Sequence, residues 1–171
     1  MVFPNLRFIV ALLALSFLSG CDLGEPFRTE QHSKPDEQVV KVYLKYDFRD
    51  QVDTFNGFLT KDLVANGTVT VSFLFTTAQQ DSILGALAQA DFFGLPDTLH
   101  PIPNVTMAPN PGPQILRVEY QGKLKSLVWF YLLDDSDPRS AAVTHLWQTI
   151  WQVVESTDSY KLLPPAVGGY I

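Results

Sequence analysis

This 171-residue chain has a single cysteine, Cys21, and few basic residues. One cysteine excludes an intrachain disulfide framework and a metal cluster built on several thiolates. Twelve Lys and Arg against 18 Asp and Glu give a formal net charge of −6. A nucleic-acid-binding domain normally carries the opposite balance, so no nucleic-acid partner is expected. Because 46% of the residues are hydrophobic, the chain is neither disordered nor collagen-like, and its length fits one globular domain.

The sequence also lacks the short motifs that are typical of catalytic and metal-binding sites. It contains no GxSxG, GxxxxGK[ST], HExxH or GxGxxG. His32, His100 and His145 lie in separate segments, whereas a zinc site needs three or four converging ligands. The acidic run Asp134–Asp137 lacks the Gly and Glu that complete an EF-hand loop. We therefore predict no metal, no cofactor and no enzymatic activity.

The first twenty residues have the pattern of a secretory leader. Arg7 supplies the positive charge, and an apolar stretch of eleven residues follows, from Phe8 to Leu18. A membrane-spanning helix needs about 20 apolar residues, whereas a signal-peptide core needs 7–15. Residues 1–20 are therefore predicted to be a signal peptide.

The end of this leader resembles the lipobox of bacterial lipoproteins. It reads Leu18-Ser19-Gly20-Cys21: an aliphatic residue, two small residues and the cysteine. The resemblance implies that Cys21 receives a diacylglyceryl group as a thioether and that a signal peptidase cuts before it. Two or three acyl chains anchor a protein stably to a membrane. It implies a location in the cell envelope, with the domain facing the periplasm or the exterior.

Residues 21–37 are interpreted as the lipidated cysteine and a flexible tether. They hold Gly24, Pro26, Ser33 and Pro35 and almost no apolar periodicity. A single domain, residues 38–171, is expected to follow. Its first half predicts a strand over 40–48, a weaker strand over 57–65, and a clear strand over 69–75 after the Asn66-Gly67 turn. Next comes a helix to about Ala90, begun by a capping box with Thr77 as N-cap and Gln80 as its partner.

The second half begins with a Pro-rich loop, residues 100–113, which proline keeps out of strand structure. Ile115–Leu133 predicts a hairpin around Gln121-Gly122. A two-residue loop would pair Val118 with Lys125, and a three-residue loop pairs Val118 with Leu124. We choose the three-residue loop. A last helix is expected to start at Asp137 as N-cap with Pro138 behind it.

The expected fold is therefore α+β: an antiparallel sheet of about four or five strands, with two helices on one face, in the order β-β-β-α-β-β-α. In the chosen register several apolar side chains point away from the first apolar face: Tyr43, Leu74, Ile115, Leu127, Trp129 and Tyr131. Either the loop and the C-terminal tail cover them, or they form a partner surface. Tyr43, Trp129 and Tyr131 are the candidate surface residues.

The functional hypothesis is a membrane-anchored envelope lipoprotein without enzymatic activity, serving as a binding or structural module. Its partners would be the membrane, through the lipid, and a protein or cell-wall component. The alternative is an envelope enzyme inhibitor that presents the Pro-rich loop 100–113, and the third hypothesis is an enzyme without a recognisable motif.

Overall fold

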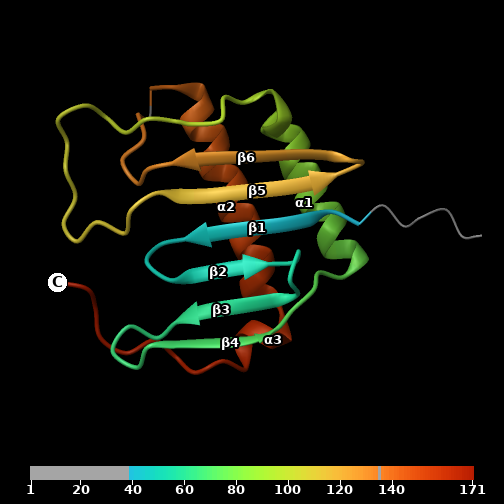
Figure 1. The fold of residues 1–171 in the computed structure, drawn as a ribbon, viewed down its shortest axis with the longest axis vertical. Helices are drawn as coiled ribbons and strands as arrows, with labels where there is room; N and C mark the ends of the chain where they lie inside the picture. Colours follow the sequence, from blue (N-terminus) through green and yellow to red (C-terminus); the bar gives the residue numbers. More distant parts are fainter. Residues whose placement is uncertain (1–38, 135) are drawn as a thin grey trace, which may run out of the picture. The chain divides into compact units, whose positions relative to one another are not determined.

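The computed structural model describes residues 39–134 and 136–171 (Figure 1). The predicted leader, Cys21 and the tether lie outside these residues. The strands are β1 (Lys41–Tyr46), β2 (Asp50–Asp53), β3 (Phe58–Asp62), β4 (Thr68–Ser72), β5 (Gln114–Tyr120) and β6 (Lys123–Trp129). The helices are α1 (Thr77–Gln89), the short 3₁₀ helix η1 (Phe92–Gly94), α2 (Pro138–Ser156) and the four-residue α3 (Asp158–Lys161).

The six strands form one antiparallel sheet in the order β4-β3-β2-β1-β5-β6. The predicted α+β class is therefore confirmed. The difference is the extra strand β2, which arises because the predicted strand 40–48 ends early. Asp47 adopts φ 54°, and this left-handed residue reverses the chain directly after Tyr46.

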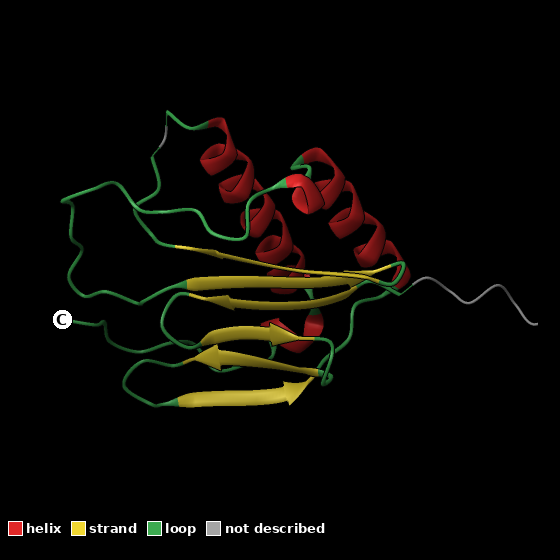
Figure 2. Cartoon of the chain, turned by 45° about the horizontal axis from the view of Figure 1, so that its top comes forward, coloured by secondary structure: helices red, strands yellow, loops and turns green. Residues whose placement is uncertain are grey.

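Both main helices pack on the same face of the sheet, behind it in Figure 1 and above it in Figure 2. The alternation of β1 explains this, because Val42 and Leu44 are buried while Lys41, Tyr43 and Lys45 are not. The strands and helices contribute one apolar core, with a central set that is nearly inaccessible to solvent: Val42, Leu44, Val52, Leu59, Ile83, Leu116, Val118, Leu127, Val143, Leu146, Ile150 and Val154.

The predicted helix starts are half right. Asp137 is the N-cap of α2 and Pro138 its first residue, as expected. At α1 the capping box is shifted by one residue, because Thr76 is the N-cap and Gln79 its partner. Gln80 has another role: its Oε1 accepts the Val40 N–H at 3.1 Å, which ties the start of β1 to α1.

The predicted register of the β5–β6 hairpin is wrong. The loop has two residues, Gln121 at φ 50° and Gly122 at φ 73°, the turn geometry that follows the twist of paired strands. Val118 therefore lies opposite Lys125, and Leu116 opposite Leu127. This register puts a lysine opposite a buried valine. The long stem of Lys125 carries its ammonium to the Asp97 carboxylate, at 2.8 Å.

Candidate aromatic pocket and Pro-rich rim

The register places the candidate surface residues in different environments. Trp129 is only 3% exposed and faces the helices, so the prediction that it points away from the first apolar face is wrong, as it is for the fully buried Leu127. Tyr43 lies on the other, helix-free face, opposite Arg117 and Asp53 on the neighbouring strands. Tyr131 remains 37% exposed. Cys21 lies outside the described residues.

The helix-free face carries a mixed set of side chains. Arg117 and Lys41 lie 5.2 and 5.8 Å from the centre of the Phe55 ring, which comes from the turn between β2 and β3. Figure 1 shows no helix in front of this face, and the Pro-rich loop extends beyond the end of the sheet. Charged groups thus interrupt the apolar side chains Tyr43 and Ile115.

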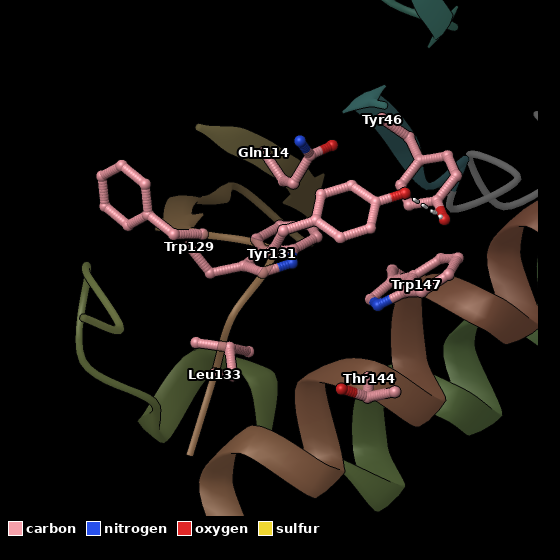
Figure 3. A pocket seen from close by; sticks show the side chains of 8 residues that line it. Tyr46, Gln114, Trp129, Tyr131, Leu133, Thr144 and Trp147 are labelled. Atoms are coloured by element: carbon pink, nitrogen blue, oxygen red, sulfur yellow. Dashed lines mark hydrogen bonds between the residues drawn. The ribbon is translucent and has the colours of Figure 1, made fainter. Parts of the chain in front are cut away.

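Trp129 and Tyr131 instead meet at a pocket of about 200 Å³ beside α2 (Figure 3). Its lining is largely aromatic: Tyr46, Gln114, Trp129, Phe130, Tyr131, Leu133, Thr144 and Trp147. Tyr46 ends β1, whereas Thr144 and Trp147 are three residues apart on α2 and so share one helix face. Strand ends and one helix face thus position the pocket.

Stacked rings build one wall of this pocket. The Tyr46 ring lies 4.2 Å from the Trp147 ring at an interplanar angle of 24°, and 6.1 Å from the Tyr131 ring at 28°. The two phenol oxygens of Tyr46 and Tyr131 are 3.1 Å apart. Figure 3 shows the indole nitrogen of Trp129 directed into the space between Tyr131, Leu133 and Trp147. The pocket therefore combines flat apolar surfaces with a few polar atoms, the arrangement of a binding site.

Gln114 holds the back of the pocket together. Its side chain is 1% exposed, its Oε1 accepts the Asp47 N–H at 2.6 Å, and its Nε2 donates to the Gly112 carbonyl at 3.2 Å. One buried amide thus joins the turn after β1 to the end of the Pro-rich loop. Since neither backbone group is left without a partner there, the two segments are fixed relative to each other.

The pocket is uncharged at neutral pH but has acidic neighbours. Burial raises the pKa of Tyr46 far above its ordinary value, helped by the hydrogen bond with Tyr131. Burial likewise raises the pKa of Tyr131, with Asp47 and Asp50 adding to the effect. Burial raises the pKa of Asp50 to about 6. Protonated phenols beside carboxylates suit a neutral or positively charged group better than an anion.

The Pro-rich loop forms the rim on the far side of Tyr131. The prediction that residues 100–113 form a loop is confirmed. A second hollow of about 110 Å³ is shared by loop and strand end: Pro101, Val105, Thr106, Met107, Asn110, Phe130, Tyr131 and Leu132. Within this hollow, Val105 and Met107 are 48% and 39% exposed. Together with Tyr131, these two side chains are the apolar rim.

Sequence reasoning missed Tyr46, Gln114, Thr144 and Trp147. In the sequence, Trp147 falls in the apolar stripe of α2 and Tyr46 follows Val42 and Leu44 at period two, so both have the pattern of core residues. The available signal was position: Tyr46 is the last residue before the left-handed turn, where a sheet face meets solvent. Gln114 carried no signal, because its burial depends on segments that are distant in sequence.

Residues 39–134 and 136–171 contain neither a metal-binding cluster nor a membrane-spanning helix. No group of three or more His, Cys, Asp or Glu side chains there could hold a metal ion. No helix in that part of the chain is long and apolar enough to span a membrane. Both described histidines, His100 and His145, are exposed and lie in separate segments, the Pro-rich loop and α2.

Comparisons with known proteins identify no relative. No family model, no curated protein and no solved structure matches this chain. The residues of the pocket and its rim are therefore the basis for proposing a function.

Proposed function

We propose that this chain is a lipid-anchored envelope protein that binds another protein through Tyr131 and the Pro-rich loop. The observation that carries the proposal is the apolar rim, because exposed apolar side chains gathered beside a concave aromatic site are typical of interaction surfaces. An aromatic or aliphatic side chain of the partner would enter the pocket beside Tyr131, where burial is deepest.

The direction of β1 supports this arrangement. The described chain begins at Val39, and β1 runs from that end of the sheet to Tyr46 at the pocket (Figure 1). Six extended residues span about 20 Å. The pocket and the loop therefore lie at the opposite end of the sheet from Val39, the residue to which the proposed tether would connect.

The negative charge of the chain favours a partner with a positively charged surface. The formal net charge is −6, and Asp47 and Asp50 lie close to the phenols of the pocket. Complementary charge accelerates association and excludes like-charged partners. We therefore propose a partner surface with an apolar side chain surrounded by Lys or Arg.

An envelope enzyme inhibitor is the second candidate, and the anchoring of the loop favours it. Ile102 N–H donates to the Leu132 carbonyl at 2.8 Å near one end, and Gln114 binds Gly112 at the other. A loop held at both ends loses little conformational entropy on binding, which suits presentation to an active site.

Site-specific photocrosslinking in intact cells tests the proposal. A photoreactive phenylalanine analogue replaces Val105 in the full chain, and the matched control carries it at Gln89, an exposed residue of α1. A discrete crosslinked protein at position 105, absent at 89 and lost when Tyr131 is also changed to Ala, is the expected result. Equal crosslinking at both positions would reject the partner surface. If the captured protein is an enzyme that the purified chain inhibits, the second candidate replaces the first.

The anchor needs a separate test. Cells fed a clickable fatty acid should label the wild-type chain and not Cys21→Ala, which lacks the acceptor thiol. Equal labelling of the two chains would overturn lipid attachment at Cys21 while leaving the partner surface untouched.

A further inference from the structure

The two edge strands of the sheet, β6 and β4, differ in whether another segment bonds to their outer side. At the β6 edge, Val128 N–H donates to the Asp97 carbonyl and Leu99 N–H donates to the Val128 carbonyl, both at 2.9 Å. A parallel bridge joins Thr98 to Val128. The segment 97–99 therefore covers part of that edge. At the other edge β4 pairs with β3, and no strand or bridge within residues 39–134 and 136–171 lies on its outer side.

The ladder with β3 determines which groups of β4 point outward. Phe73 N–H bonds to the Gly57 carbonyl at 2.9 Å, and Leu63 N–H bonds to the Gly67 carbonyl at 2.8 Å. In an antiparallel pair, bonded and non-bonded positions alternate. Gly67, Val69, Val71 and Phe73 therefore bond inward to β3. Thr68, Thr70 and Ser72 direct their N–H and C=O groups to the outside.

β4 lacks the charged residues, proline and bulges that normally prevent edge strands from pairing. Such edges carry charged residues, proline or bulges, or are covered. β4 reads Thr-Val-Thr-Val-Ser, and no charged residue or proline occurs anywhere between Asp62 and Asp81. Its pairing with β3 is regular through all five residues, and its composition is typical of stable strands. The edge is thus suited to accept a further strand.

The sequence of β4 fits a second copy of itself. If two copies run antiparallel about Thr70, that residue lies opposite its own counterpart and Thr68 lies opposite Ser72. All three outward-facing positions then become bonded positions, giving about six inter-chain hydrogen bonds. Val69 and Val71, which are half-buried on the helix side, meet Val71 and Val69 of the second copy. No like charges face each other, although each chain is acidic overall.

We propose that this protein forms a symmetric dimer by antiparallel pairing of β4 with β4 of a second copy, which joins the two sheets into one. The pairing satisfies the backbone groups of Thr68, Thr70 and Ser72 and covers the exposed sides of Val69 and Val71. The dimer places the two β6 edges and the two pockets away from the contact, because β4 and β6 are at opposite ends of the strand order. The inference does not depend on the proposed function.

Cysteine crosslinking of the full chain tests both the contact and its register. Opposed residues of a bonded antiparallel pair have Cα atoms about 5.5 Å apart, a separation that a disulfide spans. Thr70→Cys should therefore give a covalent dimer under mild oxidation. Thr68→Cys alone should give little, whereas a mixture of Thr68→Cys and Ser72→Cys chains should crosslink. Wild type, whose one cysteine is Cys21, and Ser126→Cys on β6 provide the baselines.

A second variant tests the pairing without disulfides. Thr70→Pro removes an outward N–H but none of the bonds to β3, so the domain should fold while dimerisation weakens at least tenfold in sedimentation of the full chain in detergent. Thr70→Lys, which places like charges opposite each other, should weaken it similarly if the proline variant misfolds. A monomeric wild type, a crosslink equally strong at Ser126, or a dimer that Thr70→Lys leaves intact would each overturn the proposal. A crosslink to a different protein at position 70 would assign the edge to another partner.

Discussion

The phenol oxygens of Tyr46 and Tyr131 lie 3.1 Å apart, although 85 positions separate the two residues in the chain. The contact joins the end of β1 to the segment after β6, across the intervening strand β5. The hydrogen bond holds the partly exposed side chain of Tyr131 in one position between the pocket and the Pro-rich loop. That position gives Tyr131 separable structural and binding roles.

Two substitutions of Tyr131 should distinguish these roles. Tyr131→Phe removes one hydrogen bond and should lower the free energy of unfolding by about 0.5–1.5 kcal/mol while leaving partner capture intact. Tyr131→Ala also removes the ring from the apolar rim and should abolish the crosslink at position 105. Urea denaturation and photocrosslinking measure the two effects. Loss of the crosslink in the Phe variant would mean that the hydroxyl, and not the ring, recognises the partner.

Gln114→Ala should be strongly destabilising for a polar substitution. It leaves the Asp47 N–H and the Gly112 carbonyl without their partner in a buried position, which costs about 2–3 kcal/mol. Gln152→Ala, at an exposed position of α2, is the matched control and should change stability by less than about 0.5 kcal/mol. The midpoint of urea unfolding measures both variants. Equal effects in the two would show that the amide bonds do not hold the loop.

Trp129→Ala should lower the free energy of unfolding by about 3–5 kcal/mol, because it removes a buried aromatic side chain. Leu124 lies on the same strand but is 53% exposed, so Leu124→Ala should cost less than about 1 kcal/mol. Calorimetry or denaturant unfolding gives both values. A small effect for Trp129 would support the register with a three-residue hairpin loop, in which this side chain faces away from the helices.

Asp50 should make stability depend on pH between about 4 and 6. Burial raises its folded pKa to about 6, above the ordinary value of 3.8, so the folded state holds the proton more tightly than the unfolded state. Stability therefore falls as pH rises from about 4 to about 6 and is level above that. Asp50→Asn should remove this contribution and increase stability at pH 7 by on the order of 1 kcal/mol, an amount reduced from the full shift by solvent screening. Unfolding midpoints at pH 4.5 and 7 for both chains provide the measurement. An equal pH dependence in the Asn variant would assign it to other groups.

Two glycines should respond to alanine in opposite directions. Gly122 has φ 73° in the β5–β6 turn, where a Cβ is unfavourable, so Gly122→Ala should destabilise by about 1 kcal/mol. Gly85 lies within α1, and a Cβ there would meet nothing within 4 Å. Gly85→Ala should therefore stabilise by about 0.5–1 kcal/mol. Thermal unfolding of the two variants should shift the midpoint down and up, respectively, and shifts of the same sign would contradict the assigned turn.

Local patterns were sufficient to predict the fold class. Alternation along β1, the helical stripe through Val143, Leu146 and Ile150, and the Asp137-Pro138 start of α2 each express a preference within a few residues. One such signal was misplaced by a residue at Thr77, because Thr76 and Thr77 offer the same hydroxyl with a glutamine three positions later. In the folded chain the Gln80 side chain accepts the Val40 N–H, a contact that no pattern near Thr77 indicates.

The sequence by itself determined the α+β class, the helix faces and the Pro-rich loop, because these depend on periodicity and on the missing N–H of proline. It also carries the leader pattern ending at Cys21, whose lipidation stays a prediction. Tertiary structure alone decided the hairpin register and the pocket. Lys125 is tolerated opposite Val118 because its ammonium binds the carboxylate of Asp97, 28 residues away. The same register places the Trp129 side chain in the core. Gln114 is fixed in the same way, since its Oε1 accepts the N–H of Asp47, which is 67 residues away. Contacts between residues so far apart in the sequence leave no periodic pattern in it, because they depend on how the chain folds back on itself.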